Sequence, residues 1–459
     1  MSLEVLILRK EELKRRVEAL PAEVKAWQEW SVGTLDMNAH YSQIQALAVL
    51  METFEGTQRA LLQRLDTAGN AEDFQATALQ LVREIIRSQQ VWDFFRDKLE
   101  LRFSPTFKDV LWIADTIAWD CYRPVMDRAV RAQIVPEAEV REPPLSYLTA
   151  EFSPATWLRG SRPNDGRNYQ LGTSTLPIPV IELPWDHVGN LWELVSLQHE
   201  VGHDIEGDLK LRGELLQNLV TVLGAAGVPQ QRINVWQSWA GEIFADLVAI
   251  QQGGLPFTMG LAHLLLLPAD IVTTYDPGDP HPTPYVRVLM NTAYARTLIP
   301  GDSPLEKAAA ARIDKDATSI ESSWRSLYAE IGALVSFVGD FPAIFQALMD
   351  TPVSVLRETP VRKLVPFTAA DDSRIRTASS YLRTGRNAPG PQTIAPRHCV
   401  SAARLAAAEA VDSADLPATL GHINARLTQL IRDSAPLGLR GVDDSTPHRR
   451  FIASFASLR

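Results

Sequence analysis

The spacing of apolar positions predicts which parts of the chain form helices. Across residues 9–131 apolar side chains recur every three or four positions, as in AEDFQATALQLVREIIRSQQVWDFFRDKL, which is typical of successive amphipathic helices. Turn and capping residues interrupt this pattern at 33–36, 69–71 and 104–105. We therefore expect an N-terminal helical module, residues 1–141, that contains four long helices.

Two short apolar runs then predict strands. They cover residues 145–148 and 176–183 (LPIPVIEL), and both are bounded by prolines or polar turn residues. Because Pro177 and Pro179 cannot donate a ladder hydrogen bond, we expect the second strand at a sheet edge or with one side unpaired. An edge strand there could accept an extended peptide.

Helical spacing returns after these runs. LWELVSLQHEVGHDI predicts a helix with Asp186 as its N-cap, and a further helix is expected from Pro229 to the glycine pair 253–254. The prolines and glycines of residues 272–285 predict an irregular loop. Ser303, followed by proline, predicts the start of another helix.

Taken together, these patterns predict a mainly α protein with a small β-sheet, an α+β arrangement. Residues 142–300 form the expected core, and residues 301–459 the C-terminal helical region. The basic, amphipathic end of the chain, HRRFIASFASLR at residues 448–459, predicts a helix that docks on the rest of the protein.

Composition narrows the possible partners and compartments. The chain has 45 Lys and Arg against 55 Asp and Glu, a net charge of −10, which disfavours binding to nucleic acid. No apolar run approaches the roughly 18 residues of a membrane span, and the N-terminus lacks a secretory apolar region. Two cysteines are too few for a disulfide framework. These features predict a cytoplasmic protein with no membrane span.

The chemistry is concentrated in His199, Glu200 and His203, an H-E-x-x-H sequence on a predicted helix. A spacing of four places both imidazoles on one helix face, so both can bind one zinc ion, with Glu200 close to a metal-bound water. A pair of hydrogen-bonded core histidines is the alternative. That alternative would leave Glu200, Glu242 and Asp246 as unexplained buried acids.

A zinc site of this kind needs a third protein ligand. The metzincin spacing places the third histidine at Leu209, which excludes that pattern. Glu242 and Asp246 lie four apart in WAGEIFADLVAI, so Glu242 can complete the metal sphere and Asp246 can accept the free ring N–H of a ligating histidine. A solvated helix face is the alternative for this pair. Three acids after His203 are further alternatives as ligand: Asp204, Glu206 and Asp208.

H-E-x-G-H followed by E-x-x-A-D resembles the gluzincin metallopeptidases, as in the neprilysin family and in the CAAX-processing and heat-shock zinc proteases with their soluble relatives. The likeness covers about residues 176–290. The resemblance implies that His199, His203 and Glu242 bind Zn²⁺, that Glu200 is the general base, and that Asp246 supports a ligating histidine. The segment between His203 and Glu242 is longer than in thermolysin-like enzymes, which leaves the subfamily open.

A second element resembles the CAAX-processing group. In that group a His-Pro sequence follows the helix that carries the ligand glutamate, and His281-Pro282 is similar to it. The resemblance implies that His281, Tyr285 or Arg287 stabilises the oxyanion. A loop cap or a surface ion pair is the alternative for His281 and Arg287.

We therefore expect a zinc-dependent peptidase that hydrolyses peptide bonds with a metal-activated water and Glu200 as general base. Its cofactor would be Zn²⁺ and its partner a peptide or protein substrate. The alternative is a non-catalytic helical binding or regulatory protein with a structural zinc site. The natural substrate, the choice between endo- and exopeptidase action and the oligomeric state do not follow from the sequence.

Overall fold

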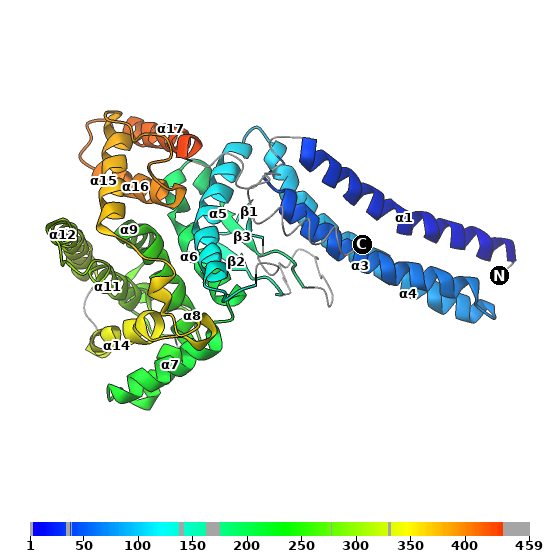
Figure 1. Cartoon of the computed structure of the whole chain (residues 1–459), viewed down its shortest axis with the longest axis horizontal. Helices are drawn as coiled ribbons and strands as arrows, with labels where there is room; N and C mark the ends of the chain where they lie inside the picture. The colour runs from blue at the N-terminus through cyan, green and yellow to red at the C-terminus, as the bar shows by residue number, and fades with distance from the viewer. Residues whose placement is uncertain are drawn as a thin grey trace.

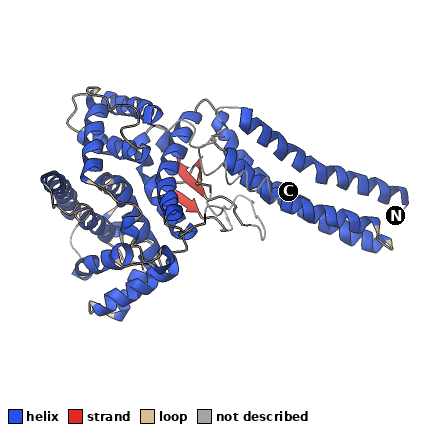
Figure 2. Cartoon of the chain, in the orientation of Figure 1, coloured by secondary structure: helices blue, strands red, loops and turns tan. Residues whose placement is uncertain are grey.

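The architecture is mainly helical with one small sheet, as expected from the sequence (Figure 2). The computed structural model describes residues 3–33, 37, 39–136, 142–161, 175–276, 278–328 and 332–434. The docking helix predicted at residues 448–459 lies outside these ranges. No helix among the described residues has the length and apolar character needed to cross a membrane.

The four long N-terminal helices are confirmed, and three of them form an elongated arm. α1, α3 and α4 pack on one another and extend away from the rest of the protein, whereas α5 packs against the body (Figure 1). Asn70 caps α4 by accepting a hydrogen bond from the Asp73 backbone N–H. The bounds are α1 Leu3–Gly33, α3 Tyr41–Asp66, α4 Ala71–Glu100 and α5 Lys108–Arg131.

The sheet has three strands, β1 (Leu145–Thr149), β2 (Ala155–Trp157) and β3 (Val180–Pro184), in the order β1-β3-β2. β3 is parallel to β1 and antiparallel to β2. The expectation that β3 is an edge strand is therefore wrong. Pro177 and Pro179 precede the ladder, which leaves the strand's N–H groups free to pair on both sides. The two edge strands are β1, which contacts α5, and the short strand β2, which contacts α6.

Four helices follow the sheet and form the centre of the body: α6 (Leu197–Asp208), α7 (Arg212–Ala225), α8 (Gln230–Gly253) and α9 (Leu255–Leu264). Asp186 does not cap α6. Two short 3-10 turns precede that helix, and they are separated by Gly189 and by Asn190, whose backbone is non-helical. The predicted end of α8 is confirmed, because Gly254 adopts φ +72° and stops the helix.

The rest of the described sequence is helical apart from loops, as predicted. Ser303 caps α12 in a reciprocal pair of hydrogen bonds with Glu306, so the predicted start of this helix is confirmed. The bounds are α10 Ala269–Val272, α11 Pro284–Ala295, α12 Pro304–Leu327, α13 Gly332–Val335, α14 Phe341–Phe345, α15 Ala369–Thr384, α16 Pro396–Glu409 and α17 Leu416–Ser434.

α6 and α8 cross closely because glycine occupies the contact. A Cβ built on Gly202 would lie 2.9 Å from the Ala245 Cα, so any larger residue would push the helices apart. Both helices belong to one continuous hydrophobic core that also includes α5, α11 and α16. This close crossing brings the H-E-x-x-H face of α6 against the acidic face of α8.

Candidate metal centre

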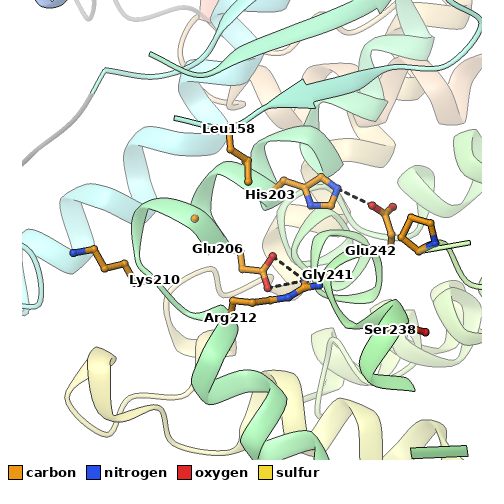
Figure 3. A pocket seen from close by; sticks show the side chains of 10 residues that line it. Leu158, His203, Glu206, Lys210, Arg212, Ser238, Gly241 and Glu242 are labelled. Carbon is orange, nitrogen blue, oxygen red and sulfur yellow. Dashed lines mark hydrogen bonds and ion pairs between the residues drawn. The ribbon is translucent and has the colours of Figure 1, made fainter. Parts of the chain in front are cut away.

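The metal-ligating groups of three residues converge where α6 and α8 cross. The Nε2 atoms of His199 and His203 lie 3.1 Å apart. Glu242 on α8 places Oε2 3.3 Å from His199 Nε2 and Oε1 3.3 Å from His203 Nε2. Figure 3 shows His203 and Glu242 facing one another. Among the described residues, these three form the group of side chains able to hold a metal ion.

The separations between these atoms fit a zinc ion. Tetrahedral bonds of 2.0–2.2 Å place neighbouring ligand atoms roughly 3.3–3.6 Å apart. Each of the observed separations, 3.1, 3.3 and 3.3 Å, agrees with this within the tolerance expected for a metal site. The two Glu242 separations involve different oxygens, so the carboxylate faces the two histidines with both. Two imidazoles and one carboxylate are also a common donor set for catalytic zinc, with a fourth position left for water.

Asp246 fixes the ring of His199. Its Oδ1 lies 2.7 Å from His199 Nδ1, and the carboxylate is fully buried. It also accepts hydrogen bonds from Arg287 at 2.7 and 2.8 Å and from Asn291 at 3.1 Å. Because an acceptor faces Nδ1, the proton resides there and the Nε2 lone pair points toward Glu242 and His203.

The electrostatics of the cluster favour a positive charge at its centre. Burial lowers the pKa of His199, but hydrogen bonds with Asp246 and Glu242 outweigh burial and raise the pKa to about 10. Burial acts to raise the pKa of Glu242, yet hydrogen bonds with both histidines hold it well below its usual value. Against burial, Arg287 lowers the pKa of Asp246 to about 2. A proton on His199 and a metal cation therefore compete for the same place.

Glu200 lies beside the cluster on the same helix and is held by a residue of the sheet. The Thr156 hydroxyl on β2 donates to Glu200 Oε2 at 2.8 Å. Glu200 lines the same cavity as His199 and His203. No sequence pattern points to Thr156, because a three-residue strand has too little periodicity to predict. Asn291 could have been found, since it lies four residues after Arg287 on one helix.

The structure separates the three residues implied as oxyanion donors. His281 is half exposed, with Nε2 3.5 Å from Glu242 Oε2 and Nδ1 2.7 Å from Asp279 Oδ1. Arg287 lines the cavity, and its Nη2 lies 3.4 Å from Glu242. Tyr285 is fully buried and its hydroxyl lies near Arg325 of α12, so it does not line the cavity.

The alternative third ligands point elsewhere. Glu206 bonds with Arg212, and Asp208 bonds with Arg159 and Tyr122. Asp204 is buried, and neither of its oxygens has a hydrogen-bond partner among the described residues. None of the three belongs to the group that converges with His199 and His203.

A cavity of about 590 Å³ opens onto the cluster. Its metal end is lined by His199, Glu200, His203, Glu242 and Arg287, and its far wall by apolar residues of α9 and the following turn. A cavity of this size, with several titratable groups at one end, is typical of a binding site for a substrate.

No protein-family model matches the sequence, and comparisons with curated proteins and with solved structures give no match either. The resemblance to gluzincins therefore depends on the motif residues alone.

Proposed function

We propose that this protein is a zinc-dependent peptidase. The observation that carries the proposal is the convergence of His199, His203 and Glu242 at zinc-like separations, with Glu200 beside them in an open cavity. The three residues would hold the ion, and Asp246 would orient His199. Zinc bound there would lower the pKa of a water ligand toward about 7 and polarise the scissile carbonyl.

The protein's own groups can then perform the proton transfers. Glu200 accepts the proton of the attacking water and later delivers it to the leaving amine. The hydrogen bond from Thr156 fixes the carboxylate for both steps. His281 lines the cavity with its Nε2 3.5 Å from Glu242 Oε2, and an N–H on this nitrogen could donate a hydrogen bond to the developing oxyanion.

β2 offers a place for the substrate backbone. Among the described residues it is the sheet edge closest to Glu200, since Thr156 bonds that side chain directly. An extended peptide can add to such an edge through main-chain hydrogen bonds. β2 thus takes the role that was expected of residues 176–183.

A purely structural zinc site is the competing function. A structural site usually closes its coordination sphere with four protein ligands. His281 lies 3.5 Å from Glu242 Oε2, but it does not belong to the group whose ligand atoms converge. The open cavity and the missing fourth ligand among the described residues favour catalysis.

We also propose a cytoplasmic location. Cys121 and Cys399 are both buried and unpaired. Free, buried thiols are typical of proteins from reducing compartments.

The deciding experiment compares the unsubstituted protein with Glu200→Gln. Both are assayed for zinc by elemental analysis and for hydrolysis of a mixed peptide library by mass spectrometry. We expect both proteins to bind one zinc per molecule and the variant to lose cleavage by about 10²-fold or more. Cleavage that persists in a zinc-loaded variant would show that Glu200 is not the base. Zinc that stabilises the protein without any cleavage would favour the structural alternative.

A further inference from the structure

Two cavities meet at the candidate metal centre. The one of about 590 Å³ and a second of about 520 Å³ share His203, Glu242 and Leu158 as lining residues. A substrate whose reactive bond lies at His203 and Glu242 can therefore extend into both cavities. The chemistry of their walls should then determine which residues flank that bond.

The larger cavity has an apolar wall, which we call the leucine wall. Phe257, at the metal end of this wall, stacks parallel to the His199 ring with 6.1 Å between ring centroids. A large apolar side chain placed here would lose its contact with water, which is the main driving force for such binding. The leucine wall comprises Phe257, Leu261, Leu264, Leu265 and Leu267.

The smaller cavity is lined by both apolar and charged residues and contains an accessible arginine (Figure 3). Arg212 Nη1 lies 3.2 and 3.3 Å from the two oxygens of Glu206. Nε and Nη2 of Arg212 have no hydrogen-bond partner among the described residues. The Arg212 side chain is 49% exposed, whereas that of Glu206 is 10% exposed. A ligand can therefore reach the guanidinium, whereas the Glu206 carboxylate is largely covered.

The stability of α7 does not account for the position of Arg212. It is the first residue of α7, where the helix dipole disfavours a cation. Its guanidinium lies on α8 at Gly241, next to the ligand Glu242. A Cβ built at position 241 would lie 2.0 Å from Arg212 Nη1, so glycine leaves room for the guanidinium here, whereas a larger residue would displace this flexible side chain. A cation thus lies one residue away from a candidate metal ligand.

We infer that the substrate is a peptide with a large apolar side chain for the leucine wall and a carboxylate for Arg212, on opposite sides of the scissile bond. This inference rests on the proposed peptidase function. An aspartate or glutamate side chain and the C-terminus of a peptide offer the same carboxylate chemistry, which a guanidinium binds through paired N–H donors. A lysine side chain would instead meet the positive charge of Arg212.

Binding to a non-hydrolysing protein tests the inference directly. Zinc-loaded, full-length Glu200→Gln is titrated with fluorescein-labelled peptides in which Leu and Asp adjoin, in both orders, within an Ala/Gly background. We expect the better of the two orders to bind at least about tenfold more tightly than its Leu→Gly, Asp→Asn and Asp→Lys counterparts. Shorter peptides that end in a free carboxylate or an amide directly after the cleavage position separate the two carboxylate sources.

Two further substitutions in this protein assign each preference to its cavity. Arg212→Gln should abolish the difference in affinity between the Asp and Asn peptides and retain the difference between the Leu and Gly peptides. Leu264→Arg should abolish the difference between the Leu and Gly peptides and retain that between the Asp and Asn peptides. Leu266→Arg and Arg374→Gln are matched controls, because both residues are exposed and neither lines the two cavities. Both controls should bind like the parent, and circular dichroism verifies the fold of every variant.

The outcomes distinguish this inference from the proposed function. Equal binding of the Asp and Asn peptides, or tighter binding of the Lys peptide, would overturn the role of Arg212. If the unsubstituted protein cleaves peptides with neither preference, the peptidase stands and the inference fails. If it cleaves none while Glu200→Gln shows both preferences, the peptidase fails and recognition in the two cavities stands.

Discussion

His199 depends on a buried carboxylate for the orientation of its ring. Asp246 has no exposed surface and accepts hydrogen bonds from three different side chains: His199, Arg287 and Asn291. A buried carboxylate is costly unless it is paired, and Arg287 supplies the compensating charge. The Asp246–Arg287 pair therefore holds the His199 ring at Nδ1, while His199 Nε2 faces the candidate metal position.

We predict that Asp246→Asn weakens zinc binding by about 10- to 100-fold without abolishing it, because the ring loses its fixed orientation and some of its basicity. Competition with a chelating dye measures the affinity. Asp340→Asn is the matched control, since Asp340 is also buried and paired, with Arg232 and Trp236, but lies outside the site. Equal zinc affinities for the two variants would contradict this role of Asp246.

A second buried histidine makes a prediction about pH. Burial, assisted by Arg397, lowers the pKa of His398 on α16 to about 3. The unfolded protein takes up a proton near pH 6.5, whereas the folded protein does so only near pH 3. The stability that His398 contributes is therefore complete above pH 6.5 and is lost as the pH falls toward 3.

We expect the unsubstituted protein to lose about 2 kcal/mol more stability than His398→Gln between pH 7.5 and pH 5. Denaturant unfolding at the two pH values measures this difference. His422→Gln, at an exposed position on α17, is the control and should lose as much as the parent. If His398→Gln loses as much stability as the parent over this range, His398 is not the group responsible.

At the scale of elements, the crossing of α6 and α8 sets the geometry of the site. The two helices supply all three candidate ligands, and Gly202 is their point of closest approach. Because glycine has no side chain, the backbones of the two helices can approach closely, and the core side chains on both sides of the crossing pack in direct contact. The distances from Glu242 to His199 and His203 therefore depend on Gly202, although this residue is not a candidate ligand.

Gly202→Ala should destabilise the protein by about 1–3 kcal/mol and weaken zinc binding, because the new methyl group would meet the backbone of Ala245. Thermal unfolding and chelator competition measure the two effects. Gly213→Ala, on α7 with nothing within 4 Å of the added Cβ, is the control and should be neutral or slightly stabilising. A Gly202→Ala protein with unchanged zinc affinity would show that the crossing does not control the site.

Elements with strong local signals could be predicted from the sequence. The four N-terminal helices, the end of α8 at Gly254 and the capped start of α12 all depend on residues adjacent in the sequence. β2 could not be predicted, because it is three residues long and exists only by pairing with β3. The prediction that β3 lies at a sheet edge was wrong for a related reason, because the order of strands in a sheet is set by residues distant in the sequence.

The same division applies to the site. His199 and His203 are related by helical spacing alone, so their shared face follows from the sequence. Helical spacing alone left several acids open as the third ligand, and the choice of Glu242 depended on the resemblance to a known motif. Arg212 and the leucine wall carry no such signal, because they reach the site only through the packing of α7, α8 and α9.

At the scale of the whole molecule, the protein has separate hydrophobic cores. α5, α6, α8, α11 and α16 share the large core that surrounds the candidate metal centre. The distal arm has its own core, formed by α1, α3 and α4, which includes Leu13, Phe74 and Leu81. Cooperative units of unfolding often follow such divisions. Metal binding at the candidate centre should therefore affect the body and the arm unequally.

Removal of zinc tests this division. An ion that binds only the folded protein stabilises it by about 2.7 kcal/mol when free zinc is about 100 times the Kd. Chelation should therefore lower the thermal midpoint and accelerate hydrogen exchange in α6, α8 and α11, while amides near Phe74 and Leu81 keep their rates. His199→Ala/His203→Ala should not respond to chelator. Equal acceleration in the arm would show that the two cores unfold as one unit, and no acceleration in α6 or α8 would show that metal does not join these helices.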